Sequence, residues 1–219
     1  MYMDGLNLKP ENLVQLTGRV RVKRYNENDK SLFLVMGIST PKSAIASAGR
    51  EDAWNRDYPS FVVEGDEAEA LNESIEEGDW IAMFGRMDTR QRMAYEGNRM
   101  YREVWEPYIK VDSVLKHEGR IDSNNVILCG EVIRVYRNAD EGKKFYMITL
   151  RTANEDGTTC RATVTYFDPQ MKLEPKVGDT VFAIGKIQTK REESEDGDRR
   201  RTRFIVSAVT RNAVIERKE

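Results

Sequence analysis

Two stretches of the chain, residues 78–90 and 178–190, repeat one alternation of apolar and polar positions 100 residues apart. Each opens with Gly-Asp, a pair that favours a turn. Each then places an apolar residue at every second position, which is the spacing of a half-buried strand. Gly85 and Gly185 stand in the middle of these strands, where a glycine indicates a bend or a bulge. The pattern predicts a duplicated β-structure whose sheets curl, as they do in a small barrel.

The flanking segments complete two repeats of similar order. Strands of the first repeat are expected at residues 13–24, 32–40, 61–63, 78–90 and 106–115. Those of the second are expected at residues 125–132, 145–152, 160–167 and 178–190, with a last strand after an arm. The registers match Gly18 with Gly130 and Thr40 with Thr152, and residues 41–57 read as a loop inserted in the first repeat.

The two repeats differ between their third and fourth strands. In the first, Asp66 as N-cap and Glu69 three residues later form a capping box, which predicts a short helix. In the second, Pro169 and Pro175 leave room for at most one turn. The order is therefore strand, strand, strand, helix or turn, strand, strand, twice over.

This order predicts an all-β protein with one short helix, built as two tandem OB-folds, which are five-stranded Greek-key barrels. The first OB-fold domain is expected to span residues 1–117 and the second residues 125–219, joined by a polar linker at 118–124. OB-folds commonly present a sheet face and two loops to oligonucleotides, so the surfaces of the barrels are where we look for function.

Composition narrows the class of protein. The 219 residues carry 39% hydrophobic and 33% charged side chains with a net charge of −2, so the chain is not strongly basic. No apolar run approaches the roughly 20 residues of a membrane helix, and no signal peptide is visible. We therefore expect a cytoplasmic protein with no membrane partner. Cys129 and Cys160 are expected to be small buried side chains, and with His117 as the only histidine neither a metal site nor a cofactor is predicted.

The sequence also lacks a catalytic set. Residues 178–186 contain glycine and lysine, but their spacing does not fit a phosphate-binding loop, no Ser or Thr follows, and the segment alternates as a strand. No carboxylate–histidine pair and no nucleophile elbow is present. We expect a binding protein rather than an enzyme, with no small-molecule substrate.

The ordered set of segments resembles the bacterial single-stranded DNA-binding proteins. In the second repeat the resemblance rests on residues 125–132, 148–152, 164–167, 178–181 and 185–187, and in the first on residues 16–20 and 78–90. That family usually carries one OB domain per chain and forms tetramers, so two domains in one chain imply a homodimer with four OB domains. The chain ends Ala-Val-Ile-Glu-Arg-Lys-Glu, where the family usually has an acidic tail with an apolar tip.

Binding a single strand requires cations along the backbone and flat side chains on which bases stack. Two arms follow the duplicated strands and offer such residues, with turns expected at Gly97 and at Gly197. The candidates on the arms are Arg90, Arg92, Tyr95, Arg99, Tyr101, Arg102, Lys190, Arg191, Arg199, Arg200, Arg201 and Arg203. The candidates on strands and on the inserted loop are Trp54, Arg56, Tyr58, Lys143, Lys144, Phe145, Tyr166 and Phe167.

Simpler interpretations of these residues stay open. The arginines at 199–203 could neutralise the acidic residues at 192–195 across the hairpin, which would make the arms solvated hairpins. Only one of Tyr166 and Phe167 can face outward by alternation. The first repeat has Glu64 at the position of Phe167, which weakens it as a stacking surface.

The first strand of the second repeat is apolar on both faces, with Ile127, Cys129 and Ile133 pointing outward. A strand of this kind should be covered on both faces, so we expect it to form a contact between OB domains, within or between chains. The outward residues of the duplicated strands are also expected to lie in an interface. They are Phe84, Phe182 and Ile184.

These observations favour a sequence-tolerant single-stranded DNA-binding protein that coats DNA in replication, recombination or repair. The alternative is an OB-fold interaction or adaptor module of a replication or conjugation complex, with weak or no nucleic-acid binding. The near-neutral charge favours this alternative. RNA binding is a third possibility that the sequence does not separate from DNA binding.

Overall fold

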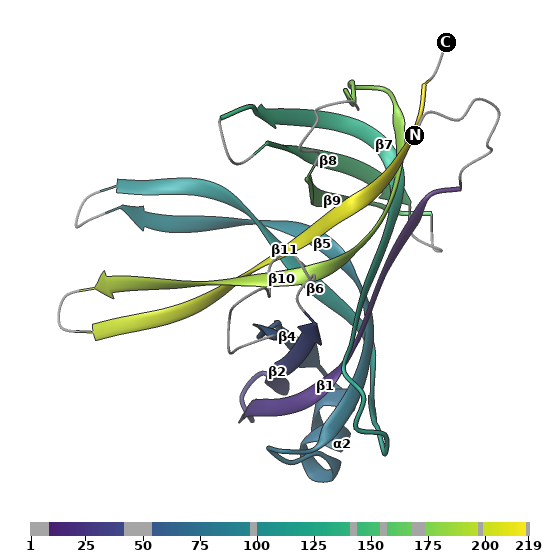
Figure 1. Ribbon diagram of the computed structural model, residues 1–219. Helices are drawn as coiled ribbons and strands as arrows, with labels where there is room; N and C mark the ends of the chain where they lie inside the picture. The colour runs from purple at the N-terminus through teal and green to yellow at the C-terminus, as the bar shows by residue number, and fades with distance from the viewer. Residues whose placement is uncertain are drawn as a thin grey trace.

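A computed structural model describes residues 9–41, 54–96, 100–140, 144–153, 157–167, 174–196 and 199–217. The described chain is almost entirely β-structure, and its one helix has nine residues, too few to cross a membrane (Figure 1). In the first repeat the elements are β1 (Glu11–Asn26), β2 (Ser31–Pro41), β3 (Trp54–Asp57), β4 (Ser60–Glu64), α2 (Asp66–Ser74), β5 (Trp80–Glu96) and β6 (Met100–Lys116). In the second they are β7 (Ser123–Asn138), β8 (Phe145–Ala153), β9 (Thr159–Tyr166), β10 (Thr180–Asp196) and β11 (Arg199–Glu216).

The strands pair in the order of two OB-folds, which confirms the predicted fold class. In the first repeat β1 pairs with both β2 and β5, β2 pairs with β4, and β5 pairs with β6. In the second repeat β7 pairs with both β8 and β10, β8 with β9, and β10 with β11. A short parallel pairing of β9 with β11 closes the second barrel. The alternating apolar residues fill both interiors, as Leu16 and its counterpart Leu128 show, each fully buried.

Local expectations fail at three places in the first repeat. The inserted segment is not all loop, because β3 forms within it and pairs with β2. The capping box is wrong, because Gly65 is the N-cap, with φ 74°, and no side chain caps the helix. The match of Thr40 with Thr152 is also wrong. Gly37 pairs with Arg19 and Arg151 pairs with Glu131, so Ile38 is the counterpart of Thr152.

The two repeats are joined edge to edge by an antiparallel pairing of β1 with β7. Val14 lies opposite its own counterpart Val126, and the pairs on either side are reciprocal, with Asn12 opposite Leu128 and Leu16 opposite Asn124. This reciprocity is the mark of a two-fold contact between like units. The expected contact of β7 with the other OB domain is therefore confirmed within the chain. It involves the edge of the strand, and β7 already begins at Ser123, inside the expected linker.

Gly85 and Gly185 lie at register shifts of the two long hairpins, which confirms the predicted bulges. A Cβ atom at either position would clash with a backbone carbonyl, that of Lys110 or that of Val209. Beyond these bulges the hairpins leave the barrels as two arms on one side of the molecule (Figure 1). We call them arm one (residues 88–96 and 100–108) and arm two (residues 188–196 and 199–207).

Each arm is fastened by an asparagine at the start of the first strand of its own repeat. Asn12 donates from Nδ2 to the Met87 carbonyl at 2.8 Å and accepts the Met87 N–H at 2.9 Å. Asn124 makes the same pair of bonds with Ile187, at 2.8 and 2.7 Å. Each amide thus satisfies both backbone groups of one residue at the root of an arm, as a neighbouring strand would.

Both cysteines are buried, as expected. Burial, together with Glu11 and Glu216, raises the pKa of the Cys129 thiol to about 11, so it stays protonated at neutral pH. Within the described ranges, no group of three or more His, Cys, Asp or Glu side chains is placed to hold a metal ion.

Candidate nucleic-acid interface

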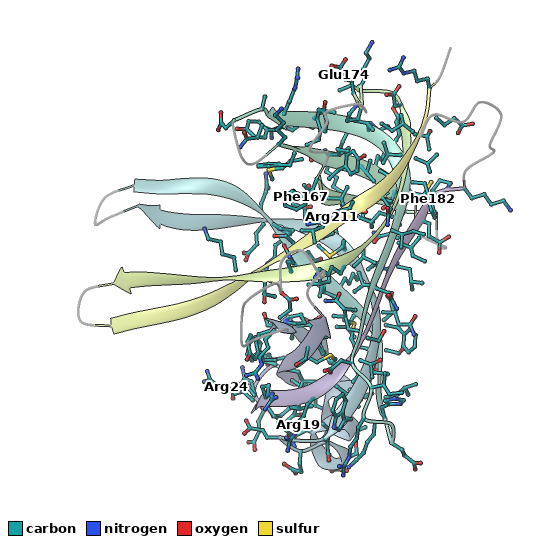
Figure 2. The ribbon with its side chains drawn as sticks, in the orientation of Figure 1. Arg19, Arg24, Phe167, Glu174, Phe182 and Arg211 are labelled. Carbon is teal, nitrogen blue, oxygen red and sulfur yellow. The ribbon has the colours of Figure 1, made fainter. Side chains whose placement is uncertain are left out.

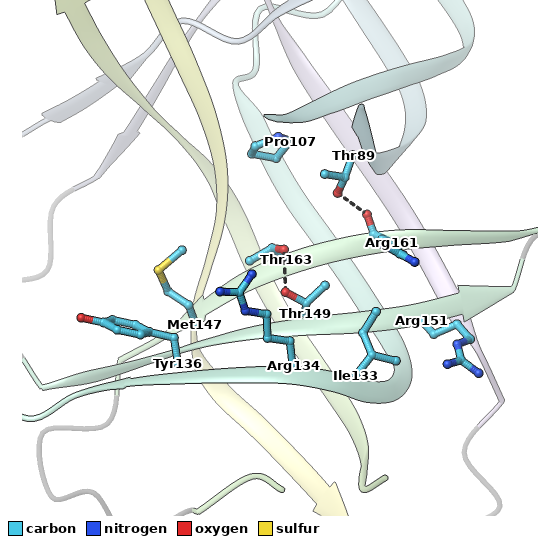
Figure 3. Close-up of a pocket in the computed structure, with 10 residues that line it drawn as sticks. All are labelled: Thr89, Pro107, Ile133, Arg134, Tyr136, Met147, Thr149, Arg151, Arg161 and Thr163. Atoms are coloured by element: carbon cyan, nitrogen blue, oxygen red, sulfur yellow. Dashed lines mark hydrogen bonds between the residues drawn. The ribbon is translucent and has the colours of Figure 1, made fainter. Parts of the chain in front are cut away.

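A groove of about 680 Å³ runs over the outer face of β8 and β9 (Figure 3). Its floor consists of alternate residues of the two strands, because alternation turns every second side chain away from the barrel core. The register places Arg151 opposite Arg161 and Thr149 opposite Thr163. The two threonine hydroxyls are 3.1 Å apart and hydrogen bonded. The floor is therefore polar and cationic at one end, and Met147 continues it at the other.

One wall of the groove comes from β7. The register of β7 against β8 shifts between Val132 and Arg134, and such a bulge allows two consecutive residues to face one side. Ile133 and Arg134 both line the groove, and Tyr136 stands beside them with 54% of its surface exposed. An exposed tyrosine next to an arginine offers a stacking surface and a cation within one site.

The opposite wall comes from the other repeat. Thr89, at the base of arm one, donates its hydroxyl to the Arg161 carbonyl at 2.7 Å, and Pro107 lies beside it (Figure 3). Arm one therefore reaches across the two-fold contact and borders the face of the second repeat. The groove is a composite of both halves of the chain.

Three arginines converge on this groove: Arg134, Arg151 and Arg161. Arg151 has an acidic neighbour in Glu131, whose Oε2 lies 3.8 Å from Arg151 Nη1 with both side chains partly exposed. Such an exposed pair contributes little, about 0–1 kcal/mol. The groove keeps a positive balance that suits a phosphate backbone, although the whole chain is slightly acidic.

The floor continues past Met147 to a second cavity of about 450 Å³, at the base of arm two. Phe167 lines this cavity, and its ring packs against Phe145 with centroids 5.9 Å apart and planes tilted by 56°. Arg56 on β3 and Lys190 on arm two also line it. Figure 2 shows Phe167 where the arms leave the barrels. Three residues predicted from the sequence, far apart in the chain, thus meet at one place.

Arm two is held against the first repeat as arm one is held against the second. The Thr189 hydroxyl accepts the Tyr58 N–H at 2.8 Å, and the Thr189 N–H donates to Asp57 Oδ1 at 2.9 Å. Thr89 and Thr189 occupy matching positions of the duplicated strands. The arms therefore cross reciprocally, and the face of β8 and β9 lies between their bases.

Other predicted site residues stand elsewhere. Tyr166 is buried, only 6% exposed, and stacks on Tyr146 inside the second barrel, so of the Tyr166–Phe167 pair Phe167 is the outward one. Arg90 lies over the Tyr108 ring at 5.2 Å, with Nε 3.8 Å from Glu106 Oε2, and so takes part in contacts within arm one. Lys144 is exposed just before β8.

Near the tips of the arms, the structure gives the pairing of backbone positions between the two strands of each hairpin. The predicted hairpins are confirmed, and the register sets Tyr95 opposite Tyr101 and Glu195 opposite Arg200, with Arg199 opposite Asp196. This register supports charge neutralisation across arm two. The backbone alone is described for Trp54, Arg92, Tyr95, Tyr101, Arg102, Arg191, Arg199, Arg200, Arg201 and Arg203, while Arg99 and Lys143 lie outside the described residues.

Sequence reasoning missed most of the groove. Arg134, Tyr136, Arg151 and Arg161 were not among the candidates, although alternation places Arg151 and Arg161 on the outer face. Arg134 is harder to find, because only the bulge brings it to the same side as Ile133. Ile133, expected in a contact between OB domains within or between chains, lines this groove together with Thr89 and Pro107 of the other repeat, and its part in a contact between chains stays a prediction.

Two curled five-stranded barrels with this strand order define a protein built from two OB-folds. The whole chain is similar to a crystal structure of the wild-type single-stranded DNA-binding protein from Thermus aquaticus. The TM-score is 0.67 and the identity 20%, over 97% of this chain and 95% of that one. A deletion mutant of the Thermus aquaticus protein matches with the same TM-score at 21% identity, over 96% of both chains.

The chain therefore has the fold of a bacterial single-stranded DNA-binding protein in its tandem two-OB form. No protein-family model matches the sequence, and neither does any curated protein.

Proposed function

We propose that this protein binds single-stranded DNA with little sequence preference and protects it in replication, recombination or repair in the cytoplasm. The observation that carries the proposal is the groove on β8 and β9, where three arginines and an exposed tyrosine line one continuous face. From Arg161 to Phe167 the face extends about 20 Å at the rise of a strand, which suits a short stretch of extended single strand. The likeness to single-stranded DNA-binding proteins supports the same role.

The chemistry favours binding over catalysis. The groove offers guanidinium groups, hydroxyls and one phenol, which hold phosphates and stack bases. A carboxylate–histidine pair is absent from the residues that line either cavity. We infer a binding protein that needs no cofactor, with a nucleic-acid strand as its ligand.

The test is a titration of fluorescent oligo-dT and oligo-rU at two salt concentrations. Binding of oligo-dT should weaken with salt, with a slope of log K against log salt of about −0.7 for each phosphate contacted. Equal binding of oligo-rU would extend the proposal to RNA. Absence of binding to either oligonucleotide at low salt would overturn it in favour of the adaptor alternative, which is consistent with acidic and basic positions facing each other across arm two.

We also propose that two chains pair through the outer face of the central sheet, giving four OB domains. Four adjacent strands, in the order β5, β1, β7 and β10, present apolar residues there. Ile127 lies opposite Leu13 on one side and opposite Ile184 on the other, and Ile184 is 49% exposed. Phe182, on the same face, lies on the side of the molecule away from the arm tips (Figure 2). An apolar stripe of this extent favours an interface.

Light scattering tests the pairing. Changing Ile127 and Ile184 together to Lys should halve the mass of the particle, because two buried charges per chain would face each other across the contact. Ile133→Lys is the matched control, since Ile133 lies in the groove, and it should leave the mass unchanged. A wild-type mass of one chain, or a double variant of unchanged mass, would contradict the pairing.

A further inference from the structure

The cavity at the base of arm two contains a carboxylate that the proposed function does not use. Asp57, on β3, lines the cavity together with Phe167, Gln188 and the two cations Arg56 and Lys190. Its side chain is 5% exposed. Oδ1 accepts the Thr189 N–H at 2.9 Å, and within the described part of the chain Oδ2 is buried and accepts no hydrogen bond.

A buried carboxylate oxygen without a hydrogen-bond donor lowers the stability of the folded protein. Buried polar atoms are nearly always hydrogen bonded, and a charged one without a donor is the most unfavourable case. Burial raises the pKa of Asp57, and the Thr189 N–H and Lys186 counteract this only in part. The residues that the structure describes do not supply the donor that Oδ2 requires.

The second repeat shows that the fold does not require a carboxylate here. Ile38 pairs with Asp57 and Thr152 pairs with Cys160, so Cys160 is the counterpart of Asp57. Cys160 shares a hydrogen bond with the Thr152 hydroxyl at 2.8 Å and accepts another from Asn12 at 3.0 Å. Arm one is fastened to the second repeat without an acid at this place. The acid of the first repeat therefore calls for an explanation beyond fastening an arm.

Resting on the proposed function, we propose that Asp57 reads the base edge of a nucleotide held in this cavity and selects bases that carry an exocyclic amine. An ionised carboxylate only accepts hydrogen bonds. The amine of cytosine donates to such a group, whereas thymine presents a carbonyl oxygen in its place. Phe167 supplies the flat surface on which the base stacks, and Arg56 and Lys190 at the same cavity hold the adjoining phosphates.

The cavity has the size and composition for such a ligand. About 450 Å³ is within the range of small-molecule sites. The lining combines the Phe167 ring, directly after β9, with the Gln188 amide and the hydroxyls of Thr165 and Ser207, which lie on strands. A phosphate would be repelled by Asp57, so the base rather than the backbone should occupy the inner part of the cavity.

The experiment compares oligo-dC with oligo-dT of one length at neutral pH, on wild-type protein and on Asp57→Asn. Wild type should bind oligo-dC at least about tenfold more tightly than oligo-dT, the effect of one hydrogen bond to a charged group. Asp57→Asn keeps an oxygen for Thr189 and turns the other atom into a donor, so the preference should vanish or reverse. A wild-type ratio near one, or an unchanged ratio in the variant, would overturn the proposal.

Asp122→Asn is the matched control. Asp122 also accepts a backbone N–H through one oxygen, from Ser39 at 3.0 Å, and has its other oxygen buried without a partner in the described residues, but it lines neither cavity. Its substitution should leave the ratio unchanged, and an equal loss of preference would overturn the assignment to Asp57.

A second measurement needs no variant and so does not depend on how Asp57→Asn folds. An oligonucleotide of 2-pyrimidinone, which is cytosine without its amine, should bind wild type no better than oligo-dT does. Binding as tight as oligo-dC would overturn the proposal. Failure of the general function would be distinct, because neither oligo-dC nor oligo-dT would then bind.

Discussion

Where the second repeat sets Arg151 opposite Arg161 on the floor of the groove, the first repeat has Gly37 and Tyr58 at the corresponding positions. Arg134, on the wall, likewise has Val22 as its counterpart. The inward residues of the two barrels, in contrast, are alike. The two sheets share one core pattern and differ in what they display.

This difference shows that a duplicated fold need not mean a duplicated site. At the far end of the floor Phe167 has Glu64 as its counterpart, and Thr165 has Val62, which is 41% exposed. At these matching positions the first repeat therefore has neither the arginines of the groove nor Phe167 and Thr165. What the first repeat adds to the site is arm one and β3, which border the face of its neighbour.

The largest expected effect comes from the arginines of the groove. Changing Arg134, Arg151 and Arg161 together to Ala should weaken oligo-dT binding about a hundredfold at low salt and reduce the salt slope by about 2. Fluorescence titrations at several salt concentrations measure both quantities. The reason is that these three side chains would hold phosphates on the face that also presents Tyr136 and Phe167.

A variant that removes the same charge from the first repeat tests whether the groove or the overall charge determines binding. Arg21, Arg24 and Lys30 are exposed cations of the first repeat, and their joint change to Ala alters the net charge by the same amount. If the site belongs to the second repeat, this control should lose no more than a few-fold in affinity. Equal losses in both triple variants would mean that overall charge, and not the groove, determines binding.

The barrels were predictable because their signals are local and occur twice. Alternation and the Gly-Asp turns placed ten strands and both arms, and Gly85 and Gly185 marked the bulges. The groove was less accessible, because it requires knowing that β1 pairs with β7 and that the arms cross. No local signal connects Thr89 with Arg161 or Arg56 with Phe167.

The incorrect match of Thr40 with Thr152 also arose because the sequence alone does not show how the strands pair. The turn before β8 is longer than the turn before β2, and a match that ignores this difference shifts the comparison of the two strands by two positions. Because two residues restore the same face of a strand, the shift leaves the core pattern intact and escapes detection. The outward residues are then compared with the wrong counterparts, as Thr40 was with Thr152.

A smaller effect, on the free energy of unfolding, is expected from changing the asparagines that the two repeats share. Asn12 and Asn124 each satisfy both backbone groups of one residue at the root of an arm. Loss of either amide leaves a buried N–H and a buried carbonyl without a partner, at a cost of about 1–3 kcal/mol. Urea unfolding of Asn124→Ala and Asn12→Ala should show both losses. The loss at Asn124, which is 9% exposed, should be the larger, because water reaches the half-buried Asn12 site more easily.

Asn125→Ala is the control for the substitution itself, because in the described structure its exposed amide donates to the nearby Ser123 hydroxyl at 3.1 Å, and stability should hardly change.

Measuring oligo-dT binding in the same two variants distinguishes the fastening of the arms, which both repeats share, from the groove, which only the second repeat has. Asn12→Ala loosens arm one, which walls the groove of the second repeat, whereas Asn124→Ala loosens arm two at the cavity beyond it. Affinity should therefore fall more in Asn12→Ala, although that variant is the more stable of the two. If affinity instead follows stability, with Asn124→Ala the weaker binder, arm one is not part of the site and the groove belongs to the second repeat alone.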